Sequence, residues 1–156
     1  MAKEHRYRLE TAWTGNRGTG TSGYTAYGRE HEIRAPGKPA LPGSSDPAFR
    51  GDPAHWNPEE LLVASLSACH MLWYLHLCAD NGIIVMEYAD HATGTMEEDE
   101  NGGQFKEVTL HPFVLVADSS MIEKAGALHK EAHQKCFIAN SCNFPVNHEA
   151  TVKAME

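Results

Sequence analysis

Residues 57–82 read NPEELLVASLSACHMLWYLHLCADNG, and this stretch decides the fold of the chain. Asn57 is a favoured N-cap residue, Pro58 suits the first helical position, and Glu60 stands where a capping-box acid reaches back to the cap. At the other end, Asp80-Asn81-Gly82 is a stop signal that tolerates left-handed backbone. The pattern predicts one long helix over residues 57–82.

Apolar or small side chains occupy nearly every face of this predicted helix. A helix that is apolar all round is normally buried. At about 1.5 Å per residue it spans roughly 36 Å, which is more than a domain of this size needs to cross its own core. We therefore expect it to cross the whole molecule or to pack against a partner's helix. Glu59 and Glu60 at its start, and His70 and His76 within it, argue against a membrane span.

The composition is that of an ordinary globular domain, and its 156 residues fit a single domain over residues 1–156. The formal net charge of −8 argues against nonspecific binding to nucleic acid or to anionic membranes, which requires basic patches. The start of the chain has no apolar leader, so we expect a cytoplasmic location. The cysteines are too sparse for a secreted disulfide scaffold, and we interpret them as free, reactive or metal-binding thiols: Cys69, Cys78, Cys136 and Cys142.

The first third of the chain predicts a hairpin followed by a long loop. Alternating residues over 6–13 and 23–33 indicate two strands joined around the glycine-rich turn at 15–20, which together form a hairpin within residues 1–34. Residues 35–56 are rich in Pro and Gly and predict a loop without a clear element of its own.

The part of the chain after the central helix, residues 83–156, predicts a second hairpin, a second helix and a final strand. Ser119 or Ser120 is the expected cap of that helix, which leads to Cys136. The hairpin strands are predicted over residues 83–96 and 104–117, and a polar turn at 97–103 joins them. The last strand is predicted over residues 146–152. Because hairpins predominate over alternating strands and helices, the fold class is α+β.

Cys69 and Cys136 are the residues that we expect to carry chemistry. A reactive thiol needs a lowered pKa, and Cys69 lies too deep in its helix for the helix dipole to supply this. Arg50 in the loop would supply a cation, and Glu59 would hold its guanidinium in place. Roughly 15 Å of helix separates Glu59 from Cys69. The two therefore share a site only if the helix deforms or if the glutamate of one subunit meets the cysteine of another.

Two other interpretations of these residues stay open. A Cys in an apolar helix is often an inert packing residue, which is how we interpret Cys78 and Cys142. His129 and His133 lie four residues apart with Cys136 three further on, a spacing that suits zinc, although no fourth ligand is evident and a solvent-facing helix explains it equally well. We expect His70 and His76 to be hydrogen-bonded core or interface residues.

The motif Asn57-Pro58-Glu59-Glu60-Leu61 is followed by Ser67-Ala68-Cys69, and Cys136 stands at the end of the later helix. With these residues the sequence resembles the OsmC/Ohr family of thiol-dependent hydroperoxide reductases over essentially the whole chain, and it is most similar to the OsmC branch. The resemblance implies a swapped homodimer in which long central helices pack between curved antiparallel β-sheets. It also implies two active sites at the subunit interface.

By position, Cys69 matches the family's peroxidatic cysteine, Cys136 its resolving cysteine, and Glu59 the glutamate that orients the active-site arginine. Arg50 is our match for that arginine, and Arg17 in the first turn is its rival. Many relatives have proline directly after the second cysteine, whereas this chain has Phe137. Cys142 and Cys78 are therefore kept as alternative resolving cysteines.

The resemblance implies a peroxidase that reduces organic hydroperoxides, and possible further substrates include hydrogen peroxide. Such a peroxidase would require no metal or organic cofactor and would depend on an external dithiol or lipoyl-type reductant. Phe49, Trp56 and Trp73 are the expected apolar wall of the substrate site. The alternative function is a non-enzymatic redox-sensing module, or a module that binds a ligand or metal.

Overall fold

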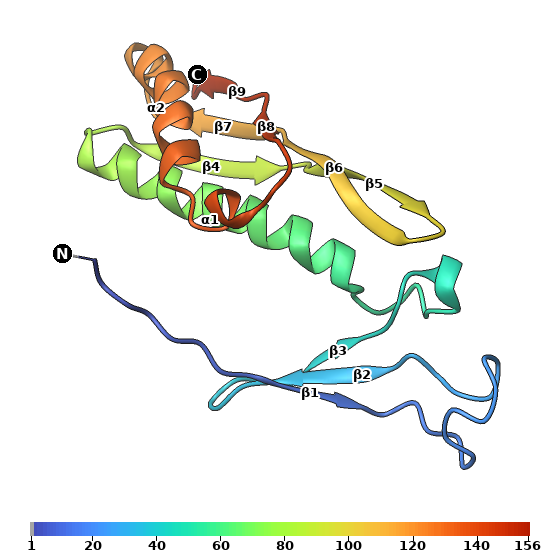
Figure 1. Ribbon diagram of the computed structural model, residues 1–156. Coiled ribbons are helices and arrows are strands. Elements are labelled where there is room, and N and C mark those ends of the chain that lie inside the picture. The colour runs from blue at the N-terminus through green and yellow to red at the C-terminus, as the bar shows by residue number, and fades with distance from the viewer. Residues whose placement is uncertain (1) are drawn as a thin grey trace. The chain divides into compact units, whose positions relative to one another are not determined.

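The computed structural model describes residues 2–156, which form two compact units divided between Leu61 and Leu62. The chain mixes helices and sheets, as the α+β prediction requires, and Figure 1 shows its elements in order. Each unit is described by itself below.

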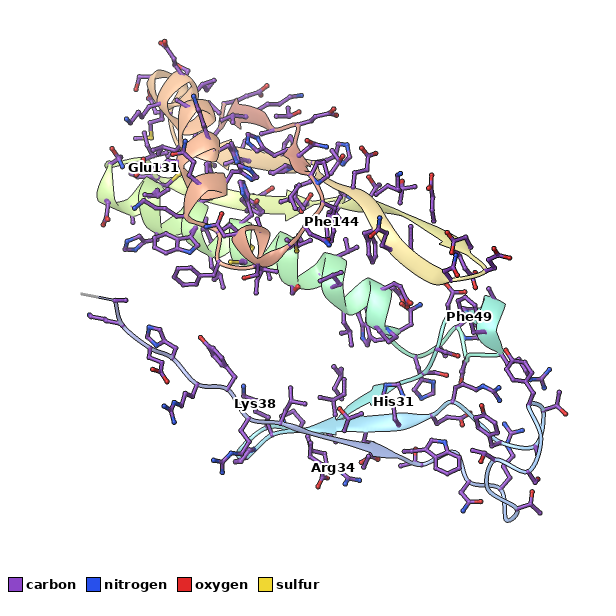
Figure 2. The ribbon with its side chains drawn as sticks, viewed as in Figure 1. His31, Arg34, Lys38, Phe49, Glu131 and Phe144 are labelled. Carbon is purple, nitrogen blue, oxygen red and sulfur yellow. The ribbon has the colours of Figure 1, made fainter. Side chains whose placement is uncertain are left out.

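The N-terminal unit contains a three-stranded antiparallel sheet in the order β1-β2-β3, formed by β1 (Glu10–Trp13), β2 (His31–Arg34) and β3 (Leu41–Gly43). The predicted hairpin is confirmed, because Glu10 pairs with Arg34 and Trp13 with His31. Arg34, labelled in Figure 2, bonds the Glu10 carboxylate at 2.9 Å and the Glu32 carboxylate at 2.7 Å.

The loop between β1 and β2 is longer than predicted, since the second strand begins at His31 and not near residue 23. The Arg29 guanidinium lies 3.9 Å from the centre of the Tyr27 ring and 4.6 Å from that of Tyr24. It also donates to the main-chain oxygens of both tyrosines. These local contacts occupy the residues that the alternating pattern assigned to a strand.

The loop predicted over residues 35–56 contains two short elements that the sequence did not reveal, namely β3 and the 3₁₀ helix η1 (Pro47–Phe49). Asp46 caps η1 by accepting the Ala48 N–H at 2.8 Å. Each element is only three residues long, too short for a periodic pattern.

Helix α1 (Pro58–Asp80) confirms the central prediction, and both of its ends have the predicted chemistry. Asn57 and Glu60 form a reciprocal capping box, in which the Glu60 N–H donates to Asn57 Oδ1 at 2.8 Å and the Asn57 N–H donates to Glu60 Oε1 at 3.2 Å. At the C-terminus the Ile83 N–H donates to the Cys78 carbonyl and Gly82 has φ +69°, which is a Schellman motif.

The described chain buries α1 on one side only, and the expected packing against a partner's helix stays a prediction. Its buried residues fall on one face, namely Leu66, His70, Tyr74, Leu77 and Cys78. On another face, Leu72 is 62% exposed. Helix α1 is apolar and long enough to cross a membrane by length and composition, yet only 28% of its most apolar window is buried in the chain.

Replacing Gly82 by Ala should lower the free energy of unfolding by about 1 kcal/mol, because a Cβ in this left-handed position is strained although it meets no neighbour within 4 Å. Gly126 is the matched control, since its added Cβ is equally unobstructed but lies inside a helix. Gly126→Ala should therefore raise the unfolding free energy by about 0.5–1 kcal/mol. Chemical denaturation of both variants measures the difference, and a stabilised Gly82→Ala chain would contradict it.

The C-terminal unit contains two three-stranded sheets in place of the single predicted hairpin. The run predicted as one strand over 83–96 divides into β4 (Val85–Asp90) and β5 (Thr93–Asp99), and the run over 104–117 divides into β6 (Gly102–Leu110) and β7 (Pro112–Val116). Figure 1 shows β5 and β6 extending as one hairpin from β4 and β7. The break occurs where Asp90 Oδ1 accepts the His111 N–H at 2.6 Å.

The predicted last strand also divides, into β8 (Val146–His148) and β9 (Thr151–Ala154). Strand β8 pairs in parallel with β6, and β9 pairs in parallel with β7, so the order is β5-β6-β8 in one sheet and β4-β7-β9 in the other. Both sheets therefore depend on the C-terminal segment.

Helix α2 (Ile122–Lys135) follows the 3₁₀ helix η2 (Ser119–Met121) and confirms the second predicted helix. The predicted caps Ser119 and Ser120 lie within η2, which Asp118 caps by accepting the Ser120 N–H at 2.8 Å, and the N-cap position of α2 is Met121. The main core lies between α1, α2 and the β4-β7-β9 sheet, and includes Tyr74, Leu77, Val114, Val116, Ala125 and Leu128. A smaller cluster surrounds Leu66 and Val108 and packs against Phe144, labelled in Figure 2.

Candidate active site

Two cysteines that are 67 positions apart by their numbers, Cys69 and Cys136, meet in the C-terminal unit. Cys69 is half-buried within α1, and Cys136 caps the C-terminal end of α2 with 1% of its surface exposed. Their thiols lie close enough for Cys69 to affect the ionisation of Cys136. All four cysteines are reduced in this structure. A disulfide between Cys69 and Cys136 would join the middle of α1 to the end of α2.

The environment of Cys136 favours its protonated form. Burial raises the pKa of Cys136 to about 11, and the neighbouring Cys69 thiol acts in the same direction. The Ala139 N–H, 3.5 Å from the Cys136 sulfur, opposes this rise. Cys136 is therefore a poor nucleophile at neutral pH unless its proton is removed.

The other two cysteines have no such contact with a thiol among the described residues. Burial raises the pKa of Cys78, which lies in the main core beside Tyr74. Cys142 is half-buried in the smaller cluster around Leu66, and burial also raises its pKa. Their positions agree with the interpretation as packing residues.

Glu59 lies in the first turn of α1, in the N-terminal unit, and has an unpaired buried atom. Its Oε2 atom is buried and has no hydrogen-bond partner within residues 2–156. The neighbouring Glu60 is already used by the capping box. A buried carboxylate oxygen left unpaired costs more than the roughly 1–3 kcal/mol typical of a neutral group. Glu59 thus offers an acceptor to a cation or another donor.

Arg50, the predicted active-site arginine, ends η1 in the N-terminal unit with a left-handed backbone. Its φ of 66° and ψ of 25° make it the single non-glycine residue of the described chain with positive φ. Its N–H donates to the Pro47 carbonyl at 3.1 Å. Strained backbone of this kind is frequent at functional sites because the surrounding structure must hold it in place. Arg17, the rival, is exposed in the loop between β1 and β2.

Trp73 of α1 and Phe137, which directly follows Cys136, form an aromatic pair close in sequence to the two cysteines. Trp73 packs edge-on against Phe137 with ring centres 5.4 Å apart, and Lys135 Nζ lies 5.6 Å from the Trp73 ring centre. A cavity of about 220 Å³ is lined by Leu72, Trp73 and His76, which share one helical face with Cys69 at spacings of three, four and seven residues. Phe137 was not among the predicted wall residues.

The remaining predicted wall residues, Phe49 and Trp56, belong to the N-terminal unit. Phe49, labelled in Figure 2, ends η1 next to Arg50, and Trp56 is half exposed before α1. Their placement in a substrate site stays a prediction.

A cluster of histidines in the C-terminal unit was not predicted from the sequence. His70 Nε2 and His129 Nδ1 lie 3.0 Å apart, and both rings are fully buried. The His148 ring centre lies 5.6 Å from those of His70 and His133. The prediction for His70 is confirmed, whereas His76 is exposed in the single chain and lies 3.3 Å from Asp80, so only its predicted interface position stays open.

The open interpretation of His129, His133 and Cys136 as a metal site receives no support from this arrangement. Within residues 2–156 no three donor side chains are placed to hold one metal ion. His129 directs Nδ1 to His70, and its buried Nε2 has no hydrogen-bond partner there.

The histidine cluster should make folding sensitive to acid. Burial lowers the pKa of His70 to about 4 and that of His129 to about 3, and neighbouring histidines act in the same direction. Because the unfolded histidines bind protons near pH 6.5, this stability is complete above that pH and declines as the pH falls toward 4. We expect a loss on the order of 2 kcal/mol per buried histidine between pH 7 and 5.

Urea unfolding at several pH values measures this dependence. His129→Gln should flatten the slope of stability against pH even if it lowers stability overall, whereas His76→Gln, which changes an exposed histidine, should leave the slope unchanged. Equal slopes in all three chains would contradict the assignment to the buried cluster.

Comparison with known proteins relates the chain to one family. The family model described as OsmC-like protein matches residues 51–151, a span that contains Glu59, Cys69 and Cys136. Arg50 and Arg17 lie outside it. No curated protein matches the chain significantly in sequence.

Solved structures extend the similarity over nearly the whole chain. An OsmC-like protein of unknown function from Vibrio cholerae has 28% identity and a TM-score of 0.82, and the match covers 95% of this chain and 100% of that one. An organic hydroperoxide resistance protein from Elizabethkingia anophelis has 22% identity and a TM-score of 0.68, covering 98% and 100%. The organic hydroperoxide resistance protein OsmC from Legionella pneumophila has 20% identity and a TM-score of 0.68, covering 96% and 99%.

The last two similarities are too low in identity to show more than the fold, but the family match covers most of the chain and includes both thiols that meet in the structure. The chain therefore belongs to the OsmC/Ohr family, some of whose members are named organic hydroperoxide resistance proteins.

Proposed function

We propose that this protein is a thiol-dependent peroxidase that reduces organic hydroperoxides to alcohols. The Cys69 thiolate attacks the terminal oxygen of the hydroperoxide, releases the alcohol and becomes a sulfenic acid. Cys136 then condenses with Cys69 to a disulfide, and an external dithiol reduces that disulfide by exchange.

The proximity of the Cys69 and Cys136 thiols, which lie close enough for Cys69 to affect the ionisation of Cys136, is the observation that carries this proposal. A sulfenic acid formed on Cys69 has a second thiol already within reach, which favours a disulfide over further oxidation. The half-buried position of Cys69 leaves it open to a small substrate, and Trp73, Leu72 and Phe137 supply an apolar surface for an alkyl group.

Arg50 and Glu59 complete the proposed site. The guanidinium would favour the Cys69 thiolate and stabilise charge that develops on the peroxide, and the unpaired Glu59 oxygen would hold it in orientation. We place this pair and the two thiols together in a homodimer, in which the exposed apolar face of α1 packs against the second copy. The dimer would also cover the apolar faces of α1 that a single chain leaves exposed.

Steady-state consumption of cumene hydroperoxide in the presence of a dithiol tests the proposal, with the Cys69→Ser variant as the comparison. Continued consumption that requires Cys69 supports a peroxidase. Loss of one equivalent of peroxide per chain without turnover, with several dithiols tried, would instead assign the protein to the redox-sensing class. No reaction of either chain would refute both functions.

A further inference from the structure

Two buried hydrogen bonds join the helices that carry the proposed pair of thiols. His70 Nε2 of α1 and His129 Nδ1 of α2 lie 3.0 Å apart, and each residue is only 1% exposed. One turn further along α1, the Tyr74 hydroxyl donates to the Ala125 carbonyl of α2 at 2.9 Å. The Tyr74 ring also stacks on the His129 ring, with ring centres 3.9 Å apart. Side chains of α1 thus hold α2 at a defined place along its length.

The histidine pair lies close in sequence to both cysteines. His70 directly follows Cys69 in α1, and Cys136 follows His129 after about two turns of α2. A shift of α2 against α1 at the two histidines therefore also moves Cys136 relative to Cys69.

The hydrogen bonds of Cys136 itself are local. Its N–H donates to the His133 carbonyl at 3.3 Å, its carbonyl accepts the Asn140 N–H at 3.0 Å, and its sulfur lies 3.5 Å from the Ala139 N–H. All of these partners belong to the end of α2 and the turn that follows it. The position of the Cys136 sulfur relative to α1 therefore depends on how this segment packs against α1.

A hydrogen-bonded pair fixes that packing more narrowly than apolar contacts do. The contact between Trp73 and Phe137 is apolar, and Phe137 is 62% exposed. Apolar contacts have no strict direction, whereas a hydrogen bond weakens steeply when its angle changes. The histidine pair also has a cost, because the buried Nε2 of His129 has no partner within residues 2–156. Two apolar residues would pack here without that cost, so direction is what the pair contributes.

We propose that His70 and His129 are positioning residues for the disulfide step, which hold Cys136 where it can attack the sulfenic acid on Cys69. This inference rests on the proposed peroxidase function. In the step, Cys136 loses its proton to solvent and its sulfur forms the S–S bond, while the S–O bond on Cys69 breaks. The released hydroxide takes a proton from solvent to become water. Cys136 is oxidised and the sulfenic sulfur is reduced, and the histidines exchange no proton with either.

The amide side chains of asparagine and glutamine provide the test, because each of them reproduces one ring nitrogen of histidine. The asparagine amide stands where Nδ1 lies along the side chain, and the glutamine amide stands where Nε2 lies. His129 uses Nδ1, so His129→Asn keeps the bond and His129→Gln loses it. His70 uses Nε2, so His70→Gln keeps the bond and His70→Asn loses it. The preferred amide is therefore opposite at the two positions, although all four variants place an amide in the core.

Each chain is mixed rapidly with cumene hydroperoxide in a single turnover, and two rates are followed. These are the loss of the Cys69 thiol and the formation of the disulfide, with dimedone to trap any sulfenic acid that accumulates. The reduction potential of the disulfide is measured against glutathione. Val114→Ala is the control for a general loss of stability, because it removes buried packing from β7 and changes neither histidine.

We expect every chain to lose the Cys69 thiol at the same rate. Disulfide formation should slow on the order of 10- to 100-fold in His129→Gln and His70→Asn relative to His129→Asn and His70→Gln. The equilibrium constant for forming the disulfide should fall about tenfold in the two slowed variants, which raises its reduction potential by about 30 mV. Val114→Ala should form the disulfide as the unaltered chain does.

Equal rates of disulfide formation within both amide pairs would overturn the positioning role while leaving the peroxidase intact. An equal slowing in Val114→Ala would overturn it as well, since the effect would then follow stability alone. Each position gives its own comparison, so if a variant fails to fold, the pair at the other position decides. No oxidation of Cys69 in the unaltered chain would overturn the peroxidase function and this inference with it.

Discussion

Cys69→Ser should reduce hydroperoxide turnover to the uncatalysed rate, while the protein keeps its fold. A serine hydroxyl stays protonated at neutral pH and cannot form a sulfenic acid, so both the attack on the peroxide and the later disulfide are lost. The half-buried position of Cys69 makes the exchange of sulfur for oxygen mild, and we expect a change in unfolding free energy within about 1 kcal/mol. Peroxide consumption and chemical denaturation of the same sample measure the two quantities.

Cys78→Ser is the matched control for this variant. Both cysteines belong to α1, but Cys78 lies in the main core with 1% of its surface exposed. Its replacement places a hydroxyl among apolar side chains, which should lower the unfolding free energy by about 1–3 kcal/mol. Turnover should nevertheless persist. If Cys78→Ser lost turnover in a folded chain while Cys69→Ser kept it, the assignment of Cys69 would be wrong.

The sequence predicts α1 well because the signals that define it are local. The bonds between Asn57 and Glu60 join residues three positions apart, and the Gly82 stop is a single residue with positive φ. Such contacts depend only on neighbours in the chain, so residue types at fixed spacing reveal them.

The divisions of the long strands were missed because distant contacts cause them. Asp90 accepts the His111 N–H across 21 positions, and this bond lies where each apolar run turns from one sheet to the other. Apolar side chains stand on both sides of each short break, at Ala89 and Ala92 and at Leu110 and Phe113, so the sequence shows no long polar turn there. Only the pairing of β6 with β8 and of β7 with β9 distinguishes the two sheets.

The contacts of the candidate site that join distant residues were likewise not predictable from sequence spacing. Nothing in the spacing of Cys69 and Cys136 predicts that they meet, and the expectation came from the resemblance to a family. His70 and His129, 59 positions apart, form a buried pair that no motif signals. The sequence left His129 open as a zinc ligand or as part of a solvent-facing helix, whereas its ring is buried and stacks on Tyr74 with centres 3.9 Å apart.

Arg50→Gly should lower peroxidase activity on the order of 100-fold or more while leaving the protein as stable as before or more stable. The activity falls because the guanidinium is the proposed source of charge stabilisation at Cys69 and the peroxide. Stability is kept because glycine adopts φ near 66° without the strain of a side chain, which offsets its greater freedom in the unfolded state. The measurements are kcat/KM for cumene hydroperoxide and the free energy of unfolding.

Arg50→Ala separates the two effects, since it removes the guanidinium and keeps a Cβ in the left-handed position. It should lose the same activity as Arg50→Gly but unfold about 1 kcal/mol more easily than that variant. Arg17→Ala tests the rival arginine, which is exposed in the loop between β1 and β2. Full activity in both Arg50 variants together with a loss in Arg17→Ala would move the catalytic cation to Arg17. The strained backbone at Arg50 would then serve the turn that ends η1, and the unpaired oxygen of Glu59 would be expected to bind Arg17 in its place.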